Sequence, residues 1–535
     1  MEVPIPSSRA SNFNSYYSRL QVYEVHRAIP VGTRHCRVPT RANLNSYCYG
    51  NCAVKIKGIA VILLVLVLGR TSAVVAQTPA VAGDICPGEL GAQVDAIANR
   101  PEFSRSRWGI LIQPLSSTAT LYSRDATKYF IPASNVKLLT TAAALQKLGA
   151  DFRIKTSVYS GENGSLYVAG RGDPSIAEPQ LKSLAQQLKQ RGISQVNELI
   201  GDDSYFQGSA VNRNWEWEDA QAGYGAPVNS LIFNQNAIEL VLSPQNLGQP
   251  LKVSFAEPKL ANQWQIQNNS VTVAPNESEF LEVGREFDRP AIRVSGQLKV
   301  GAESESSYVA VVNPANNFLQ NFQQVLTAEG IPVQQVLVTS VPRNLNQELA
   351  AVESPPLAEL VKETNRESNN LYAEVLLRLL GKFTVKMSLP QEDTNETGLK
   401  ELKTALTQLG VNPNSYILAD GSGLSRHNLI SPEALVQTLR LMANSPAASV
   451  YRASLPIAGE NGTLKNRFNS TANRVILQAK TGTLSGVSAL SGYIEVPNYE
   501  PLVFSIIVNQ SDLPASKLRS ATDEIVLLLN RLRRC

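Results

Sequence analysis

The segment that most constrains this chain runs from Pro132 to Leu139 and reads Pro-Ala-Ser-Asn-Val-Lys-Leu-Leu. A strand-like run ends at Pro132, and the alanine-rich stretch Val136–Leu148 that follows consists mostly of good helix formers. The segment therefore predicts the first turn of a helix. Residues three apart share a helix face, so the side chains of Ser134 and Lys137 can meet. A serine hydroxyl needs a base to become a nucleophile, and a lysine can serve when burial or a second cation lowers its pKa.

The Ser134-x-x-Lys137 pattern alone is weak evidence for catalysis, because an N-cap serine followed by a solvated lysine has the same sequence. Two further segments strengthen it. Ser368–Asn370 (Ser-Asn-Asn) lies at the start of a second apolar helix, and Lys480–Thr483 (Lys-Thr-Gly-Thr) closes a strand-like run. Each motif occurs once, and this set in this order is typical of penicillin-binding proteins and class A β-lactamases.

The start of the chain predicts export. Residues 1–53 are basic and show no clear periodicity. Lys55 and Lys57 then precede a short apolar run and a small-residue cleavage site before Gln77, so residues 54–76 are predicted to be a signal peptide. An uncleaved membrane anchor is the alternative, although the apolar run is too short to span a bilayer comfortably. Because signal peptides are N-terminal, we expect translation to begin at Val54 and the protein to be exported to the periplasm.

Removal of residues 1–76, which we call the leader, changes the charge of the chain. The leader holds nine basic residues against two acidic ones, so the formal charge falls from +4 for the whole chain to −3 for residues 77–535. The charge therefore does not indicate a nucleic-acid partner. Two cysteines remain after the leader, Cys86 and Cys535, and both a disulfide and two free thiols are open.

The length predicts several domains, and the segment between the first two motifs indicates where the additional ones lie. Short β-like runs alternate there with Gly, Asn, Asp and Pro turns, and helices are predicted over 176–191 and 316–329. The predicted strands are Lys155–Ser160, Leu166–Gly170, Ala237–Leu242, Leu251–Phe255, Trp264–Val273 and Pro290–Val300. After removal of the signal peptide, we expect a catalytic domain in two parts, residues 77–150 and 351–535. Inserted domains would occupy residues 151–350, with an inner insertion at about 240–310.

With these motifs, the chain resembles the low-molecular-mass class C penicillin-binding proteins, the D-alanyl-D-alanine carboxypeptidase/endopeptidase family. The resemblance covers residues 88–532 and includes Gly170–Pro174, Gly201–Phe206, Trp215–Trp217, Tyr224–Val228 and Asp420–Asn428. It implies an α/β (α+β) fold with a penicillin-binding/β-lactamase-like transpeptidase domain, in which helices surround an antiparallel sheet, plus two largely β inserted domains. A class A β-lactamase has a much shorter gap between the first two motifs. Asn369 stands where the family often has Asp, and its side chain is expected to point away from the chemistry.

The resemblance also implies the chemistry. It indicates a serine D-Ala-D-Ala carboxypeptidase that acts on peptidoglycan stem peptides, is inhibited covalently by β-lactams, and uses no cofactor or metal. Ser134 is the expected nucleophile, and Lys137, kept neutral by burial and by Lys480, its base. Ser368 is expected to relay a proton to the leaving amine, and Asn370 to hold Lys137 and the substrate amide.

Further residues are expected to bind the substrate. The side chains of Lys480, Thr481 and Thr483 would hold the terminal carboxylate, Gly482 would allow close approach of the strand, and the N–H groups of Ser134 and Thr483 would form an oxyanion hole. Arg426 would pair with a substrate carboxylate, unless it is merely solvated. Asp202 would reach the rim of the site from an inserted domain, unless it only stabilises a turn.

Two other functions stay open at this point, a serine β-lactamase and a non-catalytic penicillin-recognising module. No deacylating glutamate is recognisable, and non-catalytic modules usually lack one of the three motifs. His427 is the only histidine after residue 35, and no Gly-x-Ser-x-Gly surrounds Ser134, so neither a Ser-His-Asp triad nor a zinc site is predicted. Trp215 and Trp217 are expected to pack rather than bind. The sequence leaves open a peripheral association with a membrane and the balance between carboxypeptidase and endopeptidase activity.

Overall fold

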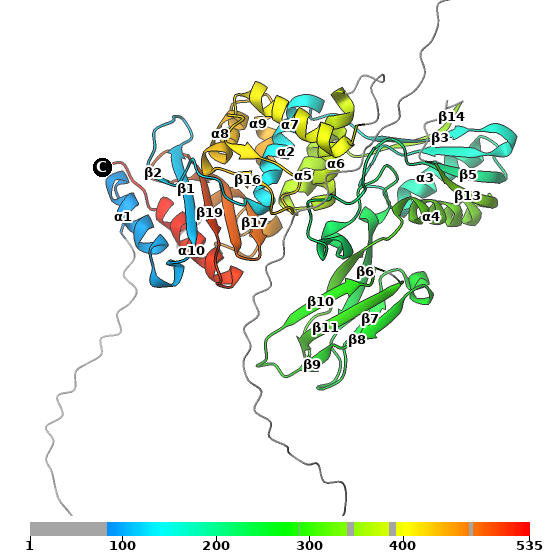
Figure 1. Ribbon diagram of the computed structural model, residues 1–535, viewed down its shortest axis with the longest axis horizontal. Helices are drawn as coiled ribbons and strands as arrows, with labels where there is room; N and C mark the ends of the chain where they lie inside the picture. The colour runs from blue at the N-terminus through cyan, green and yellow to red at the C-terminus, as the bar shows by residue number, and fades with distance from the viewer. Residues whose placement is uncertain (1–82, 288, 340–346, 385–391, 470–474) are drawn as a thin grey trace, which may run out of the picture. The chain divides into compact units, whose positions relative to one another are not determined.

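The computed structural model describes residues 83–287, 289–339, 347–384, 392–469 and 475–535 (Figure 1). The predicted extension over 1–53 and the predicted signal peptide over 54–76 lie outside these residues. Within the described ranges, no helix combines the length and the apolar character needed to cross a bilayer.

One antiparallel sheet contains strands from both ends of the described chain, in the order β17-β18-β19-β1-β2. Its strands are β1 (Arg107–Pro114), β2 (Tyr122–Arg124), β17 (Ile476–Leu484), β18 (Val487–Glu495) and β19 (Leu502–Asn509). β1 pairs with β19 along its whole length, from Arg107 opposite Asn509 to Pro114 opposite Leu502. β19 is buried throughout, as expected for a strand covered on both faces of its sheet.

Helices cover both faces of this sheet (Figure 1). α1 (Pro87–Ala98) and α10 (Ala515–Leu529) share one apolar core with the sheet, and α2 (Val136–Leu148) and α8 (Pro432–Ala443) share another. α2 is buried on all sides from Val136 to Leu145, which matches its nearly uniform apolar sequence. The other helices of the second core are α5 (Leu357–Arg366), α6 (Asn370–Thr384), α7 (Thr394–Leu409) and α9 (Ala448–Ala453).

The segment between α2 and α5 forms two further apolar cores. The first is formed mainly by a sheet in the order β13-β5-β4-β3-β14 and by the helices α3 (Glu178–Gln190) and α4 (Pro314–Ala328). The strands of this sheet are β3 (Lys155–Ser160), β4 (Leu166–Ala169), β5 (Val196–Asp202), β13 (Val333–Thr339) and β14 (Glu348–Glu353). It is a mixed sheet, because β5 runs parallel to both β4 and β13, whereas β3 runs antiparallel to both β4 and β14.

The second core of this segment is all-β and consists of the residues between β6 and β12. Its strands are β6 (Ala237–Ser243), β7 (Lys252–Phe255), β8 (Gln265–Asn268), β9 (Val271–Val273), β10 (Phe280–Arg285), β11 (Ala291–Lys299) and β12 (Glu305–Ala310). The predicted single strand Trp264–Val273 is wrong, because β8 and β9 are separate strands. The Asn268 side chain accepts a hydrogen bond from Ser270 N at 3.1 Å and so forms a turn between them.

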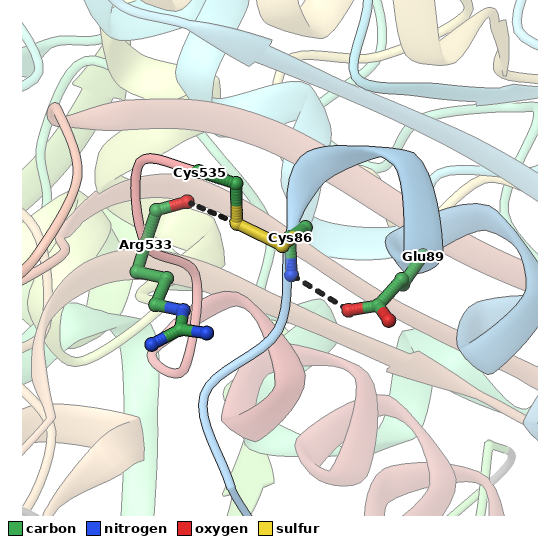
Figure 2. Close-up of a disulfide and its surroundings, with 4 residues drawn as sticks. All are labelled: Cys86, Glu89, Arg533 and Cys535. Carbon is green, nitrogen blue, oxygen red and sulfur yellow. Dashed lines mark hydrogen bonds between the residues drawn. A yellow bond between two sulfur atoms is a disulfide. The ribbon is translucent and has the colours of Figure 1, made fainter.

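The two ends of the described chain are tied together covalently. Of the two alternatives for the cysteines, the structure has the disulfide, with 5.8 Å between the Cα atoms of Cys86 and Cys535 (Figure 2). Backbone hydrogen bonds flank it, since Ile85 N donates to Arg531 O at 2.9 Å and Arg533 N donates to Ile85 O at 3.1 Å. The disulfide therefore joins segments that already pair with each other.

Candidate active site

Ser134 lies in a short 3-10 turn, Ala133–Asn135, that leads directly into α2. The preceding residue, Ala133, has a φ of 48°, a left-handed conformation that costs a non-glycine residue about 1–3 kcal/mol and is frequent at functional sites. The strand β17 packs closely against this turn at Gly482, where a Cβ atom would lie 2.8 Å from Pro132 O. The missing side chain at Gly482 thus permits close approach of the segment that carries Ser134, and the part of Gly482 in substrate binding stays a prediction.

The Nζ atom of Lys137 contacts three oxygen atoms. It lies 3.0 Å from Ser134 Oγ, 2.7 Å from Asn370 Oδ1 and 2.6 Å from the backbone oxygen of Ser422. The last two oxygens can only accept hydrogen bonds. A neutral amine has two N–H groups and one lone pair, so these two oxygens take both N–H groups and leave the lone pair for the Ser134 hydroxyl.

The orientation of the Asn370 amide is determined by a second contact. Its Nδ2 atom donates to Tyr224 O at 2.9 Å, and a backbone carbonyl cannot donate in return. Asn370 Oδ1 must therefore face Lys137. The neighbouring Asn369 side chain points elsewhere, as expected, and donates to Gln235 Oε1 at 2.8 Å and to Glu363 Oε1 at 3.2 Å.

Burial favours the neutral form of Lys137. Its side chain is 0% exposed, and desolvation lowers its pKa to about 7, partly opposed by the carboxylates of Asp420 and Glu374. An amine with this pKa is available as a proton acceptor near neutral pH.

The second lysine of the site, Lys480, is also fully buried. Its Nζ atom donates to Ser368 Oγ at 2.9 Å and to Thr481 O at 3.0 Å. Burial, and next the positive charge of Lys137, lower the pKa of Lys480 well below its ordinary value, while Glu367 opposes this shift. In the free enzyme, therefore, both lysines are shifted toward the neutral form.

The Ser134 hydroxyl opens into a cavity of about 830 Å³, within the usual range for ligand sites. Ser134, Ser368, Asn370, Arg426 and Thr483 all line it. The structure thus brings residues of all three motifs together, although they are separated by hundreds of positions in the chain. Among the described residues, no cluster of His, Cys, Asp and Glu is suited to hold a metal ion.

Three predicted binding residues have other contacts. Arg426 lies at the cavity wall, where its Nε atom pairs with Glu216 Oε1 at 3.1 Å and its Nη1 atom donates to Ser485 O at 3.1 Å. The Thr481 hydroxyl donates to Thr463 Oγ1 at 2.7 Å. Asp202 does not line the cavity; its carboxylate accepts a hydrogen bond from Ser204 N at 2.9 Å, which is the turn contact considered as the alternative.

Sequence reasoning missed several residues that line the cavity, among them Trp217, Asp219 and Tyr224. Trp217 was expected to pack, and its ring does stack on Phe287 with 4.5 Å between centroids, yet 66% of the residue is exposed. The resemblance had singled out the segments that contain Trp217 and Tyr224, and this was the only available signal. Nothing local distinguishes the acidic residues of that segment from solvated ones.

Comparisons with known proteins agree with this geometry. A sequence profile of the D-Ala-D-Ala carboxypeptidase 3 (S13) family matches residues 90–532. A D-alanyl-D-alanine carboxypeptidase of Actinomadura sp. is 34% identical over 449 residues, which cover 80% of this chain and 82% of that protein. The D-alanyl-D-alanine carboxypeptidase DacB of Haemophilus influenzae is 27% identical over 419 residues, 76% of this chain and 85% of that protein.

A solved structure agrees as well. The crystal structure of penicillin-binding protein 4 from Haemophilus influenzae has a TM-score of 0.68 and 26% sequence identity, and the match covers 83% of this chain and 99% of that one. The predicted α+β fold, with helices around an antiparallel sheet, is confirmed by this match. The chain belongs to the D-Ala-D-Ala carboxypeptidase 3 (S13) family, and it is a serine-type D-Ala-D-Ala carboxypeptidase.

Proposed function

We propose that the enzyme removes the terminal D-alanine from peptidoglycan stem peptides through an acyl-enzyme on Ser134. One observation carries this assignment: Lys137 Nζ lies 3.0 Å from Ser134 Oγ and also contacts Asn370 Oδ1 and Ser422 O, two oxygens that can only accept. In the neutral amine these two oxygens take both N–H groups, so the lone pair is left for the Ser134 hydroxyl. A buried amine held in this way is suited to take the serine proton.

The reaction then follows from the arrangement of the remaining groups. Ser134 attacks the carbonyl of the penultimate D-Ala while Lys137 accepts its proton. The backbone N–H groups of Ser134 and Thr483 stabilise the oxyanion, and loss of one such donor typically costs about 10²–10³ in rate. Ser368, in contact with Lys480, relays to the leaving amine the proton that Lys137 took from Ser134, and the C–N bond of the substrate breaks. Water then hydrolyses the ester and returns the proton to Ser134.

Substrate binding is assigned to the wall formed by β17. Lys480 would hold the terminal carboxylate together with the hydroxyls of Thr481 and Thr483, and the bound anion would raise the pKa of Lys480 and return it to its charged form. Arg426 is placed to attract a second carboxylate at the cavity wall. For Asp202, the contacts favour a structural role in its turn.

The same site explains inhibition by β-lactams, which offer Ser134 a strained amide in place of the peptide. Support comes from the Haemophilus influenzae penicillin-binding protein 4, which has also been solved in complex with a β-lactam and has a TM-score of 0.65 to this chain.

We place the mature enzyme in the periplasm, with its N-terminus near Gln77 after removal of residues 54–76. The sheets and cores support the proposed inserted domains over 151–350, with the all-β core as the inner insertion. N-terminal sequencing of the exported protein tests the predicted start near Gln77, and a start upstream of Lys55 would contradict it.

Mass spectrometry of defined muropeptides tests the activity. Loss of a single D-Ala from a pentapeptide is the expected product, and cleavage of a cross-linked dimer would add endopeptidase activity. Rapid turnover of penicillin without attack on either muropeptide would instead identify a β-lactamase. Equal product from wild type and Ser134→Ala would overturn the assignment of the nucleophile.

A further inference from the structure

The backbone oxygen of Ser422 takes one of the two N–H groups of Lys137, so the position of this carbonyl decides where the lone pair points. The peptide units around it are held by side chains from two helices. Glu374 of α6, which is buried, accepts hydrogen bonds from Gly421 N at 3.0 Å and from Ser422 N at 2.8 Å. Thr140 of α2 donates to Gly421 O at 2.7 Å.

Asp420 organises the rest of this loop, residues 419–428, which we call the Asp420 loop. Its fully buried carboxylate accepts five hydrogen bonds. The donors are Trp215 Nε1 at 3.0 Å, Ser422 Oγ at 3.3 Å, Gly423 N at 2.8 Å, Ser425 N at 2.6 Å and Asn428 Nδ2 at 2.7 Å. Four of them belong to the loop itself, whereas Trp215 comes from the segment between α2 and α5.

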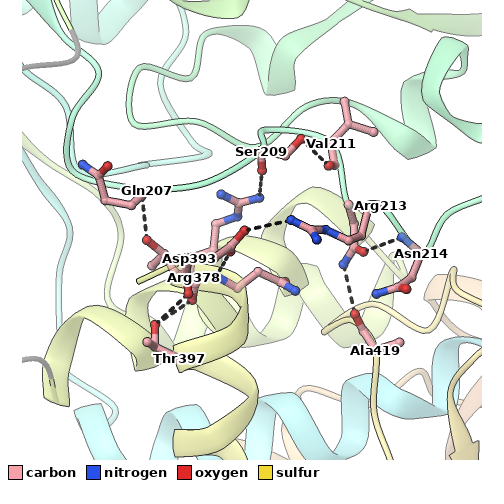
Figure 3. Close-up of polar contacts among 12 residues, drawn as sticks. Gln207, Ser209, Val211, Arg213, Asn214, Arg378, Asp393, Thr397 and Ala419 are labelled. Carbon is pink, nitrogen blue, oxygen red and sulfur yellow. Dashed lines mark hydrogen bonds and ion pairs between the residues drawn. The ribbon is translucent and has the colours of Figure 1, made fainter. Parts of the chain in front are cut away.

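That segment contacts the Asp420 loop at two more points. Asn212 Nδ2 donates to Ala419 O at 3.0 Å, and Ser425 Oγ donates to Asn214 O at 2.8 Å. The segment is also anchored to α6, where Arg378 donates to Ser209 O at 2.7 Å (Figure 3). The stretch 209–215 is therefore fixed to α6 at one end and to the Asp420 loop at the other.

We propose that Trp215 and Asp420 are positioning residues for the catalytic base: the indole N–H holds the Asp420 carboxylate, and this carboxylate holds the loop whose Ser422 carbonyl orients the Lys137 amine. Neither residue lines the cavity into which the Ser134 hydroxyl opens. The inference deepens, and rests on, the proposed role of Lys137. It gives the inserted segment a part in catalysis that is separate from substrate binding.

The charges around Lys137 make a second consequence measurable. Asp420 and Glu374 face the amine from the loop and from α6, and a negative charge on either favours its protonated form, while Lys480 of β17 is the other titratable group nearby. Burial, and next the Asp420 charge, raise the pKa of Glu374 to about 8, so loss of the Asp420 charge also makes Glu374 easier to ionise. With residue 374 held neutral, removing the Asp420 charge lowers the pKa of Lys137, so more of the base is neutral in mild acid.

The test measures acylation by a fluorescent penicillin between pH 5 and 9, resolved into a dissociation constant for the initial complex and a first-order acylation rate. Trp215→Phe removes the indole N–H and keeps most of the apolar bulk. We expect its acylation rate to fall about tenfold with the dissociation constant within about twofold of wild type, because a misplaced base slows chemistry without weakening binding. Asp420→Asn should lose more rate, and in a Glu374→Gln background, where residue 374 cannot ionise, it should also shift the acidic limb of the pH profile to lower pH.

Trp108→Phe is the matched control, because Trp108 is a buried tryptophan whose Nε1 has no hydrogen-bond partner in the described structure. It should acylate like wild type, and thermal melting shows whether each variant is folded. An unchanged acylation rate in Trp215→Phe, or a loss carried by the dissociation constant, would overturn the proposal. So would a folded Asp420→Asn, Glu374→Gln variant whose acidic limb coincides with that of Glu374→Gln alone. Failure of the proposed function is distinct, since wild type would then carry no label on Ser134.

Discussion

Asn370 Oδ1 and Lys137 Nζ lie 2.7 Å apart, and the direction of this hydrogen bond is set from the other end of the amide, where Asn370 Nδ2 donates to Tyr224 O. The amide therefore cannot flip to offer Lys137 a donor. Together with Ser422 O, it occupies both N–H groups of a neutral amine and leaves Ser134 as the partner of the lone pair. The predictions below follow from this arrangement.

Replacing Lys137 with arginine keeps the positive charge but removes a group that can lose its proton, because a guanidinium stays protonated at any usable pH. We expect the rate of acylation by labelled penicillin to fall by about 10²–10⁴, the usual contribution of a general base. Circular dichroism and thermal melting check that the variant is folded. Acylation at the wild-type rate would exclude Lys137 as the base.

Replacing Asn370 with aspartate places a carboxylate within hydrogen-bond distance of Lys137. An adjacent negative charge favours the ammonium form, so the pKa of Lys137 should rise from about 7 and the acidic limb of acylation should move about 1–3 pH units upward.

Asn369→Asp is the matched control for this variant, since the Asn369 side chain is turned toward Gln235 and Glu363. Its limb should coincide with that of wild type. If the acidic limbs of both variants coincide with that of wild type, residue 370 does not contact the base.

The Asp420 loop packs so closely on the nucleophile turn that only glycine fits at position 423. Gly423 has a φ of +86°, and a Cβ atom there would lie 1.9 Å from Ala133 O. Gly423→Ala should displace this turn and lower the acylation rate about 100-fold, the cost expected for a shift of about 1 Å at a catalytic group.

Gly410→Ala controls for backbone strain. Gly410 also has a positive φ, +106°, but the nearest atom to its Cβ position lies 3.6 Å away, in Leu441. This variant should lose some stability and keep its acylation rate. Equal losses of rate in the two variants would trace the effect to strain in general rather than to the contact with Ala133.

The disulfide should contribute stability only. Removal of a native disulfide typically costs about 2–4 kcal/mol, and the backbone pairing at Ile85 should keep the ends together in the folded enzyme. We therefore expect the double variant Cys86→Ser, Cys535→Ser to melt at a lower temperature and to be acylated by penicillin normally at 25 °C. Two titratable thiols in the native, exported wild type would show that the bond does not form.

Local patterns predicted some elements to the residue. They are α2 (Val136–Leu148), which carries Lys137 and has a long run of helix formers, and β3 (Lys155–Ser160), which is bounded by turn residues. Strand β13 (Val333–Thr339) was not predicted, since most of its residues are exposed or partly exposed and lack a clean alternation.

The site was predicted only as far as its motifs. The contact between Trp215 and Asp420 joins residues 205 positions apart, and nothing in the local sequence shows that a carboxylate will be buried there. The same limit explains why Asp202 was selected from a Gly-Asp-Asp-Ser turn while Asp219, which lines the cavity, was passed over. Which acidic residue faces a cavity depends on the packing of distant segments.

The most direct test of the account is the site of covalent labelling. Purified enzyme is incubated with a fluorescent penicillin, digested and mapped by mass spectrometry, with Ser134→Ala treated in parallel. The account predicts one penicilloyl group per chain, on the peptide that contains Ser134, and no label on the variant. Label on another residue, or full labelling of Ser134→Ala, would contradict it.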